Sequence, residues 1–271
     1  MSQNKETLLD ELITFLENER EMYGPFSVNA YIKQKETSAV SDLQANPNSG
    51  SQNSLSQQTA SNPAAESSAD IETEPLSLNQ KLKQCKSLEE LKELCLESDQ
   101  LKTDLEGTNL VFGTGNPNAG LMIIGEAPGY NEDQQGEPFV GAAGQLLNKI
   151  LKAIDFERKD VYIANILKHR PPDNRNPTSE ERERSLPFLE RQVDLIAPKL
   201  ILCVGKVSGT TLLGRDEALK SMRGEFYDYR GAKLTVTYHP AALLRNPKWK
   251  RPVWEDVQKV RELYDELDGT S

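Results

Sequence analysis

Short apolar runs and longer amphipathic stretches alternate along the second half of the chain. Four runs are almost wholly apolar, as in strands buried on both faces of a parallel sheet; they are Leu121–Ile124, Val161–Leu167, Leu200–Val204 and Leu234–Tyr238. Three stretches place apolar residues three and four positions apart, as in amphipathic helices; they are Gln145–Ile154, Glu180–Leu195 and Val253–Leu267. Strands that alternate with helices predict the α/β class, with a parallel sheet and helices on both of its faces.

Two capping signals mark helix starts in this part of the chain. Ser87-x-x-Glu90 opens an apolar pattern that continues to Leu96, and Thr178-x-x-Glu181 opens the second amphipathic stretch. In a capping box the hydroxyl accepts from a backbone N–H three residues later, and the glutamate accepts from the N–H of the cap residue. Both motifs therefore predict the first residue of a helix.

The first 80 residues have two other patterns. Within residues 1–35, the stretch from Glu6 to Met22 has apolar residues at helical spacing among acids, which predicts an amphipathic helix. This helix could dock on the protein's own core, bind a protein partner or pair with a second copy. Residues 36–75 contain no aromatic residue, Lys or Arg and consist mainly of Ser, Asn, Gln, Ala, Pro and six acids. Such a segment cannot offset its conformational entropy by burial, so we expect residues 36–80 to be a disordered linker and 81–271 a folded domain.

The charge is distributed unevenly. The chain of 271 residues has a formal net charge of −10, which argues against nucleic-acid binding because phosphate contacts need Lys and Arg. Residues 1–80, however, carry 4 basic and 12 acidic residues, whereas the rest carry 28 basic and 30 acidic residues. The second part is therefore nearly neutral and can be locally basic.

Targeting and disulfide signals are absent from the sequence. We found neither a signal peptide nor an apolar run near the ~18 residues that a membrane span needs. The three cysteines, Cys85, Cys95 and Cys203, are too scattered for a disulfide framework. We therefore expect a cytoplasmic protein that does not enter a membrane.

Polar segments follow the predicted strands, at the sheet edge where doubly wound folds place their sites. The turn from Gly125 to Asp133 has two glycines, which let backbone N–H groups approach a ligand, and three acids, including Glu126 and Glu132. Three acids at one strand end repel one another unless a ligand, cation or water network uses them. A turn of this composition can also be ordinary structural punctuation.

Two further residues suggest binding of a planar, polar ligand. Phe139 lies in a second glycine-rich loop, Gly136–Gly141, where it can fill the core or stack on a planar ligand. Asn165 interrupts an apolar strand, and a buried amide costs stability unless it is paired. Its donor and acceptor match the Watson–Crick edge of a pyrimidine, although an Asn that pairs with the backbone has the same signature.

The last segment with candidate chemistry begins at His239, directly after the fourth predicted strand. From Lys233 to Arg251 there are five basic residues and no acid, with Trp249 among them, which suits contact with a nucleic-acid backbone. Two adjacent leucines resemble the apolar wedges that hold a flipped step open. The residues expected to contact DNA are Leu243, Leu244, Arg245, Lys248, Lys250 and Arg251.

Four ordered motifs together resemble the family 4 uracil-DNA glycosylases, over about Gln80 to Asp265. They are Gly125–Gly129 followed by Glu132-Asp133, Gly136–Gly144, Asn165–Asn174, and His239–Arg245 continuing through Lys250–Asp256. The resemblance implies a hydrolase that cuts the N-glycosidic bond of flipped-out deoxyuridine in single- or double-stranded DNA and leaves an abasic site for base excision repair. It makes residues 81–271 the catalytic domain and does not cover the N-terminal helix or linker.

The resemblance also implies roles for individual residues. Phe139 would stack on the flipped uracil, Asn165 would bind its edge and reject cytosine, and His239 would donate toward uracil O2 as charge builds on the leaving base. Glu126 and Ala127 belong to the first motif and would form part of the uracil pocket.

No general base can be assigned within the first motif. The best-known branch of the superfamily has an Asp at one position of this motif. This chain has Ala127 there, and family 4 also has Ala. We therefore expect a dissociative path in which the leaving base is stabilised and a nearby carboxylate or amide steers water. Glu132 is the best candidate for that steering, and Asn174 matches a position that orients the water or completes the pocket.

The chain departs from family 4 at the metal centre. The family holds a [4Fe-4S] cluster through four cysteines, and the corresponding positions here are Cys95, Ser98, His169 and Ser185. Because serines are poor iron–sulfur ligands, we expect neither a cluster nor any other metal. Packing, for example by the helix from Leu88 to Leu96, must then replace the link between residues 95–98 and the loop after Asn165.

Two other functions are compatible with the sequence. A catalytically weak or inactive DNA-binding or scaffold protein would explain the missing ligands and the long N-terminal tether. A nucleotide- or phosphate-binding hydrolase could use the glycine turn after Ile124, but the chain lacks a G-x-x-x-x-G-K-[ST] loop. We expect a monomer whose partner is uracil-containing DNA, with the N-terminal helix available to a protein partner.

Overall fold

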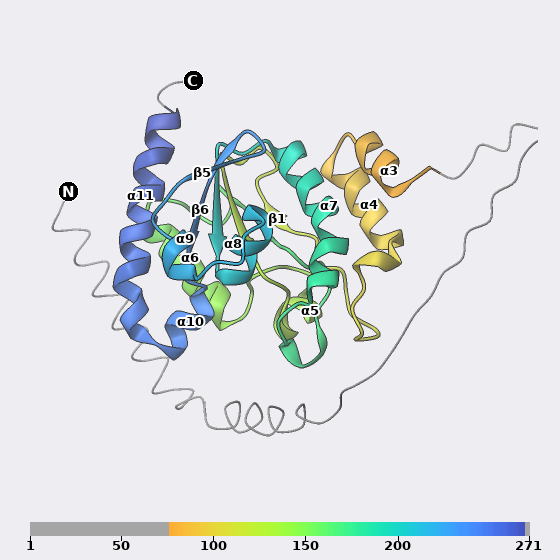
Figure 1. The fold of residues 1–271 in the computed structure, drawn as a ribbon, viewed down its shortest axis with the longest axis horizontal. Helices are drawn as coiled ribbons and strands as arrows, with labels where there is room; N and C mark the ends of the chain where they lie inside the picture. Colours follow the sequence, from red (N-terminus) through yellow and green to blue (C-terminus); the bar gives the residue numbers. More distant parts are fainter. Residues whose placement is uncertain (1–75, 269–271) are drawn as a thin grey trace, which may run out of the picture. The chain divides into compact units, whose positions relative to one another are not determined.

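The structure is a computed structural model that describes residues 76–268 (Figure 1). The predicted N-terminal helix and residues 36–75 of the predicted linker lie outside the described residues. Within the described range, six strands form one sheet in the order β1-β3-β2-β4-β6-β5. Their bounds are Thr114–Gly115 (β1), Leu121–Gly125 (β2), Tyr162–Asn165 (β3), Leu200–Val204 (β4), Tyr227–Tyr229 (β5) and Ala232–Thr237 (β6). The four inner strands are parallel, as predicted, and the two edge strands are antiparallel.

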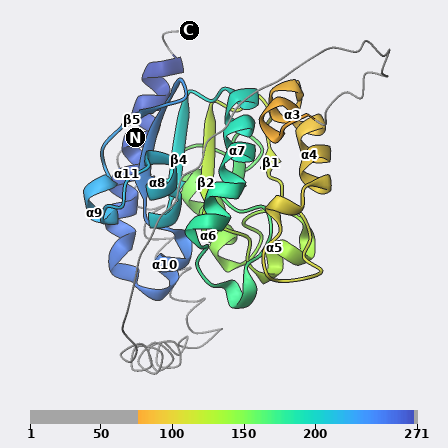
Figure 2. The same cartoon turned by 45° about the vertical axis from the view of Figure 1, so that its right-hand side comes forward.

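Helices cover both faces of the sheet, which confirms the predicted fold class. The α-helices are α3 (Leu78–Gln84), α4 (Leu88–Glu97), α5 (Tyr130–Gln135), α6 (Ala142–Ala153), α7 (Ser179–Ile196), α8 (Lys206–Leu213), α9 (Leu219–Met222), α10 (Pro240–Arg245) and α11 (Lys250–Asp268). Side chains from α6, α10 and α11 share one core with alternate strand residues such as Ile123 and Ile163. Side chains from α7, α8 and α9 pack with the intervening strand residues, such as Met122 and Ile124, on the other face. Figures 1 and 2 show α11 and α7 on opposite sides of the sheet.

A third apolar cluster joins α3 and α4 to the outer side of α7. Its buried residues include Leu91 and Cys95 from α4 and Phe188 from α7. This apolar cluster contains Cys95, one of the four positions that correspond to the metal-binding cysteines of family 4. None of the helices within residues 76–268 is long and apolar enough to cross a membrane.

Three local predictions need correction. The sheet is mixed, because the edge strands β1 and β5 run antiparallel to their neighbours. The sequence did not predict these two strands, because two or three residues are too short to give an alternating pattern. The predicted end of the linker, residue 80, is too late, because helix α3 already begins at Leu78. Its start is fixed by a capping box between Ser77 and Gln80. The box at Ser87 is only half formed, because the Glu90 carboxylate accepts from the N–H of Lys86 instead of from that of the cap residue. The box at Thr178 has both hydrogen bonds.

Candidate active site

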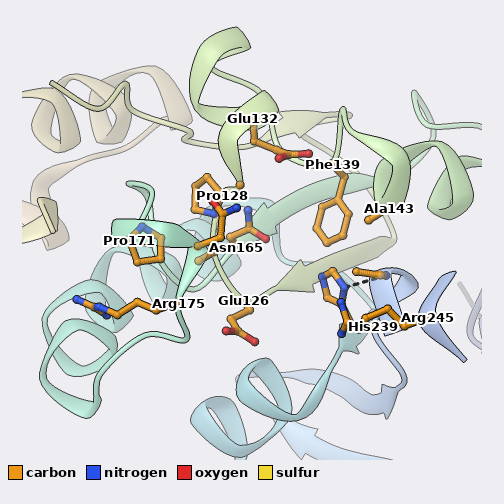
Figure 3. Close-up of a pocket in the computed structure, with 14 residues that line it drawn as sticks. Glu126, Pro128, Glu132, Phe139, Ala143, Asn165, Pro171, Arg175, His239 and Arg245 are labelled. Carbon is orange, nitrogen blue, oxygen red and sulfur yellow. Dashed lines mark hydrogen bonds between the residues drawn. The ribbon is translucent and has the colours of Figure 1, made fainter. Parts of the chain in front are cut away.

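A cavity of about 390 Å³ opens at the carboxyl ends of β2, β3 and β6 (Figure 3). It is formed where three loops converge, because parallel strands end at the same edge of the sheet. The cavity is lined by every residue that the sequence suggested for catalysis or uracil binding, and by one of the suggested DNA contacts. These residues are Glu126, Ala127, Glu132, Phe139, Asn165, Asn174, His239 and Arg245.

Gly125 sets the spacing at the back of the cavity. It pairs with Asn165 in the register of β2 and β3, so the ends of the two strands lie side by side. A Cβ atom at Gly125 would clash with Asn165 Oδ1 and lie 2.6 Å from the Phe139 ring. Glycine is therefore needed here for close approach of these two side chains, which gives it a purpose other than phosphate binding.

Phe139 forms one wall of the cavity. Its side chain is buried, and its ring stacks on the His239 imidazole with 5.4 Å between centroids and 29° between planes. The backbone of Phe139 has a φ of 55°, a left-handed conformation that costs free energy for a residue with a side chain. Contacts around the turn must therefore hold this conformation.

Glu132 is one of the residues that hold the Phe139 turn. Its Oε1 atom accepts hydrogen bonds of 2.9 Å from the backbone N–H groups of both Val140 and Gly141. This arrangement uses one carboxylate oxygen as a structural acceptor, which the sequence did not suggest. For the predicted role of Glu132 in steering water, only its Oε2 atom therefore remains available.

Arg158 holds the same turn from the other side. Its guanidinium donates to the carbonyl oxygens of Phe139 (3.2 Å) and Pro138 (2.5 Å) and to Asn148 Oδ1 (3.4 Å). Burial lowers the pKa of Arg158, and the nearby acidic side chains oppose this shift. Sequence reasoning missed this residue, because it lies in a short turn before β3 where no motif marks it.

Asn165 presents an unpaired acceptor. It is the last residue of β3 and is 2% exposed, and no hydrogen-bond partner for its Oδ1 atom exists among residues 76–268. A buried acceptor without a partner costs about 1–3 kcal/mol. Because Asn165 lines the cavity, the site is suited to a ligand that brings an N–H donor to this atom.

His239 is a neutral hydrogen-bond donor. It caps α10, and its Nδ1 atom accepts from the backbone N–H of Ala241 at 3.1 Å. A neutral imidazole with Nδ1 as acceptor carries its proton on Nε2. Burial, and then the positive charge of Arg245, lower the pKa of His239 to about 4. At neutral pH the side chain can therefore donate from Nε2 to a ligand without carrying a positive charge.

Glu126 and Asn174 also line the cavity. Burial raises the pKa of Glu126, and Arg182 opposes that shift. Asn174 has a φ of 52°, and its Oδ1 atom accepts from Arg170 Nε at 2.7 Å. A carboxylate and an amide are thus part of the cavity lining beside the base-binding side chains.

The residues suggested for DNA contact separate into two groups. Arg245, Lys248 and Arg251 are exposed, and Arg251 pairs with Glu255 on its own helix. Lys250 is only 8% exposed, so its suggestion as a phosphate contact is wrong.

The suggested leucine wedge is corrected by the orientation of α10. Leu243 is 1% exposed and packs in the core against α6 and α11, so it is wrong as a wedge. Successive residues of a helix point in different directions, so the two leucines cannot share an exposed face. Leu244 is half-buried against the same core.

The positions that resemble the family 4 cluster ligands do not suit an iron–sulfur centre. Cys95 is 1% exposed, and burial raises the pKa of its thiol to about 12, which favours the neutral form over the thiolate that binds iron. Ser98 ends α4. No group of three or more His, Cys, Asp or Glu side chains within residues 76–268 is arranged to hold a metal ion.

The other two positions have protein partners. His169 is buried with its Nδ1 atom 3.0 Å from the Thr108 hydroxyl, and burial lowers its pKa. The Ser185 hydroxyl is buried and donates to the Ile166 carbonyl oxygen at 2.7 Å. Each hydrogen bond joins segments that are far apart in the sequence.

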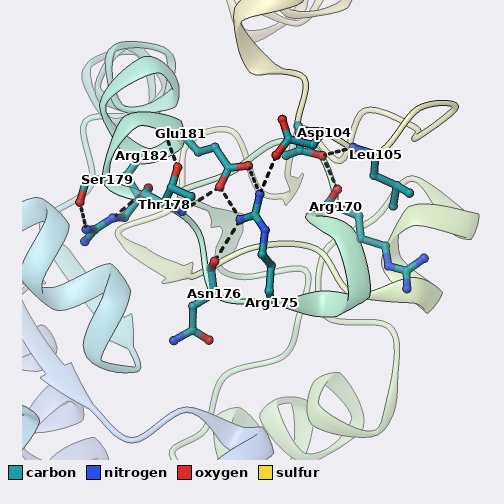
Figure 4. Close-up of polar contacts among 10 residues, drawn as sticks. Asp104, Leu105, Arg170, Arg175, Asn176, Thr178, Ser179, Glu181 and Arg182 are labelled. Atoms are coloured by element: carbon teal, nitrogen blue, oxygen red, sulfur yellow. Dashed lines mark hydrogen bonds and ion pairs between the residues drawn. The ribbon is translucent and has the colours of Figure 1, made fainter. Parts of the chain in front are cut away.

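Polar contacts link the loop after α4 to the loop after β3 (Figure 4). The Thr103 hydroxyl donates to the Arg170 carbonyl oxygen at 2.6 Å. Arg175 binds Glu181 through two hydrogen bonds of 2.8 Å and also reaches Asp104 at 3.2 Å. These contacts connect the same two parts of the chain that a cluster would otherwise cross-link.

Lys168 adds a buried link beneath the same loop. Its side chain is fully buried, and its ammonium donates to Gln192 Oε1 (2.5 Å), to the Asn165 carbonyl oxygen (3.0 Å) and to the Phe112 carbonyl oxygen (3.3 Å). Burial lowers its pKa to about 7. Lys168 therefore ties the end of β3, where Asn165 lies, to α7 and to the segment before β1.

A doubly wound sheet with a buried amide, an aromatic ring and a neutral imidazole at its carboxyl edge has the features of an α/β enzyme that binds a nucleobase. Residues 112–258 match the Uracil DNA glycosylase superfamily. The chain is 42% identical over 186 residues to a type-4 uracil-DNA glycosylase of Sulfurisphaera tokodaii, covering 65% of this chain and 84% of that protein. Type-4 uracil-DNA glycosylases of Archaeoglobus fulgidus (40% over 177 residues; 62% and 87% covered) and Thermotoga maritima (39% over 163 residues; 59% and 85% covered) are similar. The chain belongs to the uracil-DNA glycosylase superfamily.

Proposed function

We propose that this protein is a uracil-DNA glycosylase that hydrolyses the N-glycosidic bond of deoxyuridine flipped out of DNA and leaves an abasic site. The observation that carries the proposal is the meeting of Phe139, Asn165 and His239 in one cavity. The type-4 glycosylases named above support it, since they match this chain across most of their length.

Base recognition follows from the unpaired Asn165 Oδ1 atom. Uracil has an N–H at position 3 and a carbonyl oxygen at position 4, so an amide can accept from the first and donate to the second. Cytosine has an acceptor at N3 and an amino group at C4, which would place like against like at both atoms. Asn165 therefore favours uracil over cytosine, while Phe139 provides an aromatic face for stacking.

Bond cleavage is assisted by the neutral His239. When the bond between N1 and C1′ breaks, its electron pair goes to the base, and the negative charge spreads to O2. The Nε2–H of His239 donates to O2 and stabilises that charge, a role worth about 10²–10³ in kcat for an oxyanion-hole donor. Because the pKa of this imidazole is about 4, the ring is neutral at pH 7 and acts by hydrogen bonding, without a positive charge of its own.

Water then completes the reaction at the sugar. The cation left at C1′ is attacked by water, and the proton that the water loses balances the negative charge on the departing uracil. Ala127 offers no general base at the position where the best-known branch has Asp. The carboxylates of Glu126 and Glu132 line the cavity, where negative charge favours the cation and can orient the water.

The activity is tested with a labelled oligonucleotide that contains one deoxyuridine. Purified protein should convert it to a strand that alkali breaks at that position. His239→Ala should reduce the rate about 10²–10³-fold, with only the small fall in melting temperature that loss of the α10 cap causes. A wild-type protein that leaves no alkali-labile site would overturn the proposal. Tight binding of uracil-DNA without cleavage would support the inactive DNA-binding alternative.

We also propose that the enzyme works without an iron–sulfur cluster. The chemistry of the four corresponding positions supports this, since they offer one buried neutral thiol, two hydroxyls and one hydrogen-bonded imidazole. Iron analysis and the absorption spectrum of protein purified without oxygen test it. A brown protein with a broad band near about 400 nm would contradict it.

A cytoplasmic location, a monomeric state and a protein partner for the N-terminal helix stay part of the same proposal. The nearly neutral charge of residues 81–271 and the exposed Arg245, Lys248 and Arg251 support DNA as the partner of the folded domain. Sedimentation of the full chain tests the oligomeric state.

A further inference from the structure

Tyr130 is an exposed aromatic residue beside the active-site cavity. It is 56% exposed, and the other exposed large hydrophobic residues within residues 76–268 are Leu76 and Leu96. Tyr130 is the first residue of α5, directly after Gly129, which lines the cavity. An exposed ring at this place has no role in the reaction described above.

Arg170 covers the Tyr130 ring. Its guanidinium carbon lies 5.1 Å from the ring centroid, which is a cation–π contact. The arginine is fixed at both ends, because its Nε donates to Asn174 Oδ1 at 2.7 Å and its carbonyl oxygen accepts from the Thr103 hydroxyl. Figure 4 shows the Arg170 side chain extending away from the Arg175 ion pair. Since Asn174 lines the cavity, Tyr130 and Arg170 adjoin it through a hydrogen-bonded contact.

We infer that Tyr130 and Arg170 form a second base-binding site, which stacks an unpaired base next to the flipped uracil in single-stranded DNA. The inference rests on the proposed function and deepens it. An exposed aromatic ring paired with a cation is the combination that binds single strands, because every base has a π-face and every nucleotide a phosphate. In duplex DNA the neighbouring base is already stacked and paired, so the site contributes less there.

The inference is tested by removing either the ring or the base. Single-turnover rates at subsaturating enzyme are measured on a single-stranded oligonucleotide with one deoxyuridine, and on two versions in which the nucleotide 5′ or 3′ of the uracil lacks a base. Tyr130→Ala should slow cleavage of the intact oligonucleotide at least about fivefold, the lower end of the cost of losing a base–aromatic stack. Wild type should lose a similar factor on one of the two abasic versions, whereas Tyr130→Ala should lose little more there.

Three controls define the result. Tyr130→Phe keeps the ring and should retain the effect of the flanking base. Leu96→Ala removes a comparably exposed side chain from α4 and should behave as wild type. The loss in Tyr130→Ala should be smaller on the same sequence in a duplex.

Two outcomes would overturn the inference. Tyr130→Ala could cleave the intact strand as fast as wild type, or it could lose as much as wild type when the flanking base is removed. If even wild type fails to cleave, the proposed function is wrong, and fluorescence anisotropy with the same three oligonucleotides still decides the inference. Equal affinity of wild type and Tyr130→Ala for the intact strand would then refute it.

Discussion

The ring of Phe139 lies against the imidazole of His239, so the two side chains share one wall of the cavity. Phe139 comes from the loop before α6, and His239 comes from the start of α10. Each side chain limits the movement of the other, which fixes both the stacking surface and the Nε2 donor.

The first prediction is that substitutions at these two positions are not additive. Phe139→Leu should lower kcat/KM by removing the stacking face and also by loosening His239. The double variant with His239→Ala should therefore lose less than the two single losses combined, with a coupling energy of about 0.5–3 kcal/mol, as for other residues in contact. Single-turnover rates of the four proteins measure this energy, and strict additivity would show that the stacking is incidental.

The second prediction concerns the protonation of His239. Its pKa of about 4 is below the ordinary value of 6.5, so the ring should stay neutral from pH 5 to 8 with its proton on Nε2. Between pH 4 and 6.5 the unfolded chain binds the proton and the folded protein does not, so this group's contribution to stability falls as the pH falls through that range. NMR of the ¹⁵N-labelled imidazoles checks the protonation state and the tautomer, since the chain has only two histidines and His239→Ala assigns the signals. Urea unfolding of wild type and His239→Ala between pH 4 and 6.5 checks the effect on stability. A ring that titrates near pH 6.5 would contradict the prediction.

The third prediction is a change of base preference in Asn165→Asp. A carboxylate repels uracil O4 but can accept from the amino group of cytosine. Activity on uracil should fall about tenfold or more, since a good pair of hydrogen bonds discriminates between bases by about 1–3 kcal/mol. The ratio of cleavage rates on uracil and cytosine in the same sequence measures the change. An unchanged ratio would show that Asn165 does not read the base.

The fourth prediction is that Arg158 supports Phe139 without touching substrate. Arg158→Met should reduce kcat/KM and lower the free energy of unfolding by about 1–3 kcal/mol, because two buried carbonyl oxygens lose a donor. Arg158→Lys should recover part of both losses, since it restores the charge but not the fork of donors. Lys159→Met provides a control, because the neighbouring Lys159 is exposed and forms its ion pair with Glu157 at the surface. Equal effects of Arg158→Met and the control would argue against the role.

The fifth prediction is a pH-dependent stability that originates at Lys168. Its pKa of about 7 lies below the usual 10.5, so between these values the unfolded chain holds a proton that the folded protein lacks. The contribution of Lys168 to the free energy of unfolding should rise with pH over this range, by up to about 1.4 kcal/mol per pH unit. Urea unfolding of wild type and Lys168→Met between pH 7 and 9.5 isolates it, with the exposed Lys102→Met as control. The same slope in wild type and Lys168→Met would refute the assignment.

The sequence predicted the inner sheet and the cavity well, because both depend on strong local signals. The buried parallel strands are nearly continuous apolar runs, and their carboxyl ends must converge. Phe139, Asn165 and His239 therefore met in the structure although they are far apart in the chain.

The remaining features depend on packing that a linear pattern does not encode. Whether Leu243 or Leu244 faces solvent depends on the rotation of α10 against α6, which the alternation of residue types leaves open. Arg158 and Lys168 are single charged residues without a repeating pattern, and only the three-dimensional arrangement reveals what they hold.

The pairing of Gly125 with Asn165 links base selection to the alignment of two strands. Because side chains alternate along a strand, deleting one residue of β3 would turn the amide toward the opposite face of the sheet and bring an apolar neighbour to its place. A change of that kind would leave the composition of the cavity loops intact and still abolish the choice of base. Small insertions and deletions in β3 should therefore be far more damaging to specificity than the same changes in the loops that carry Phe139 and His239.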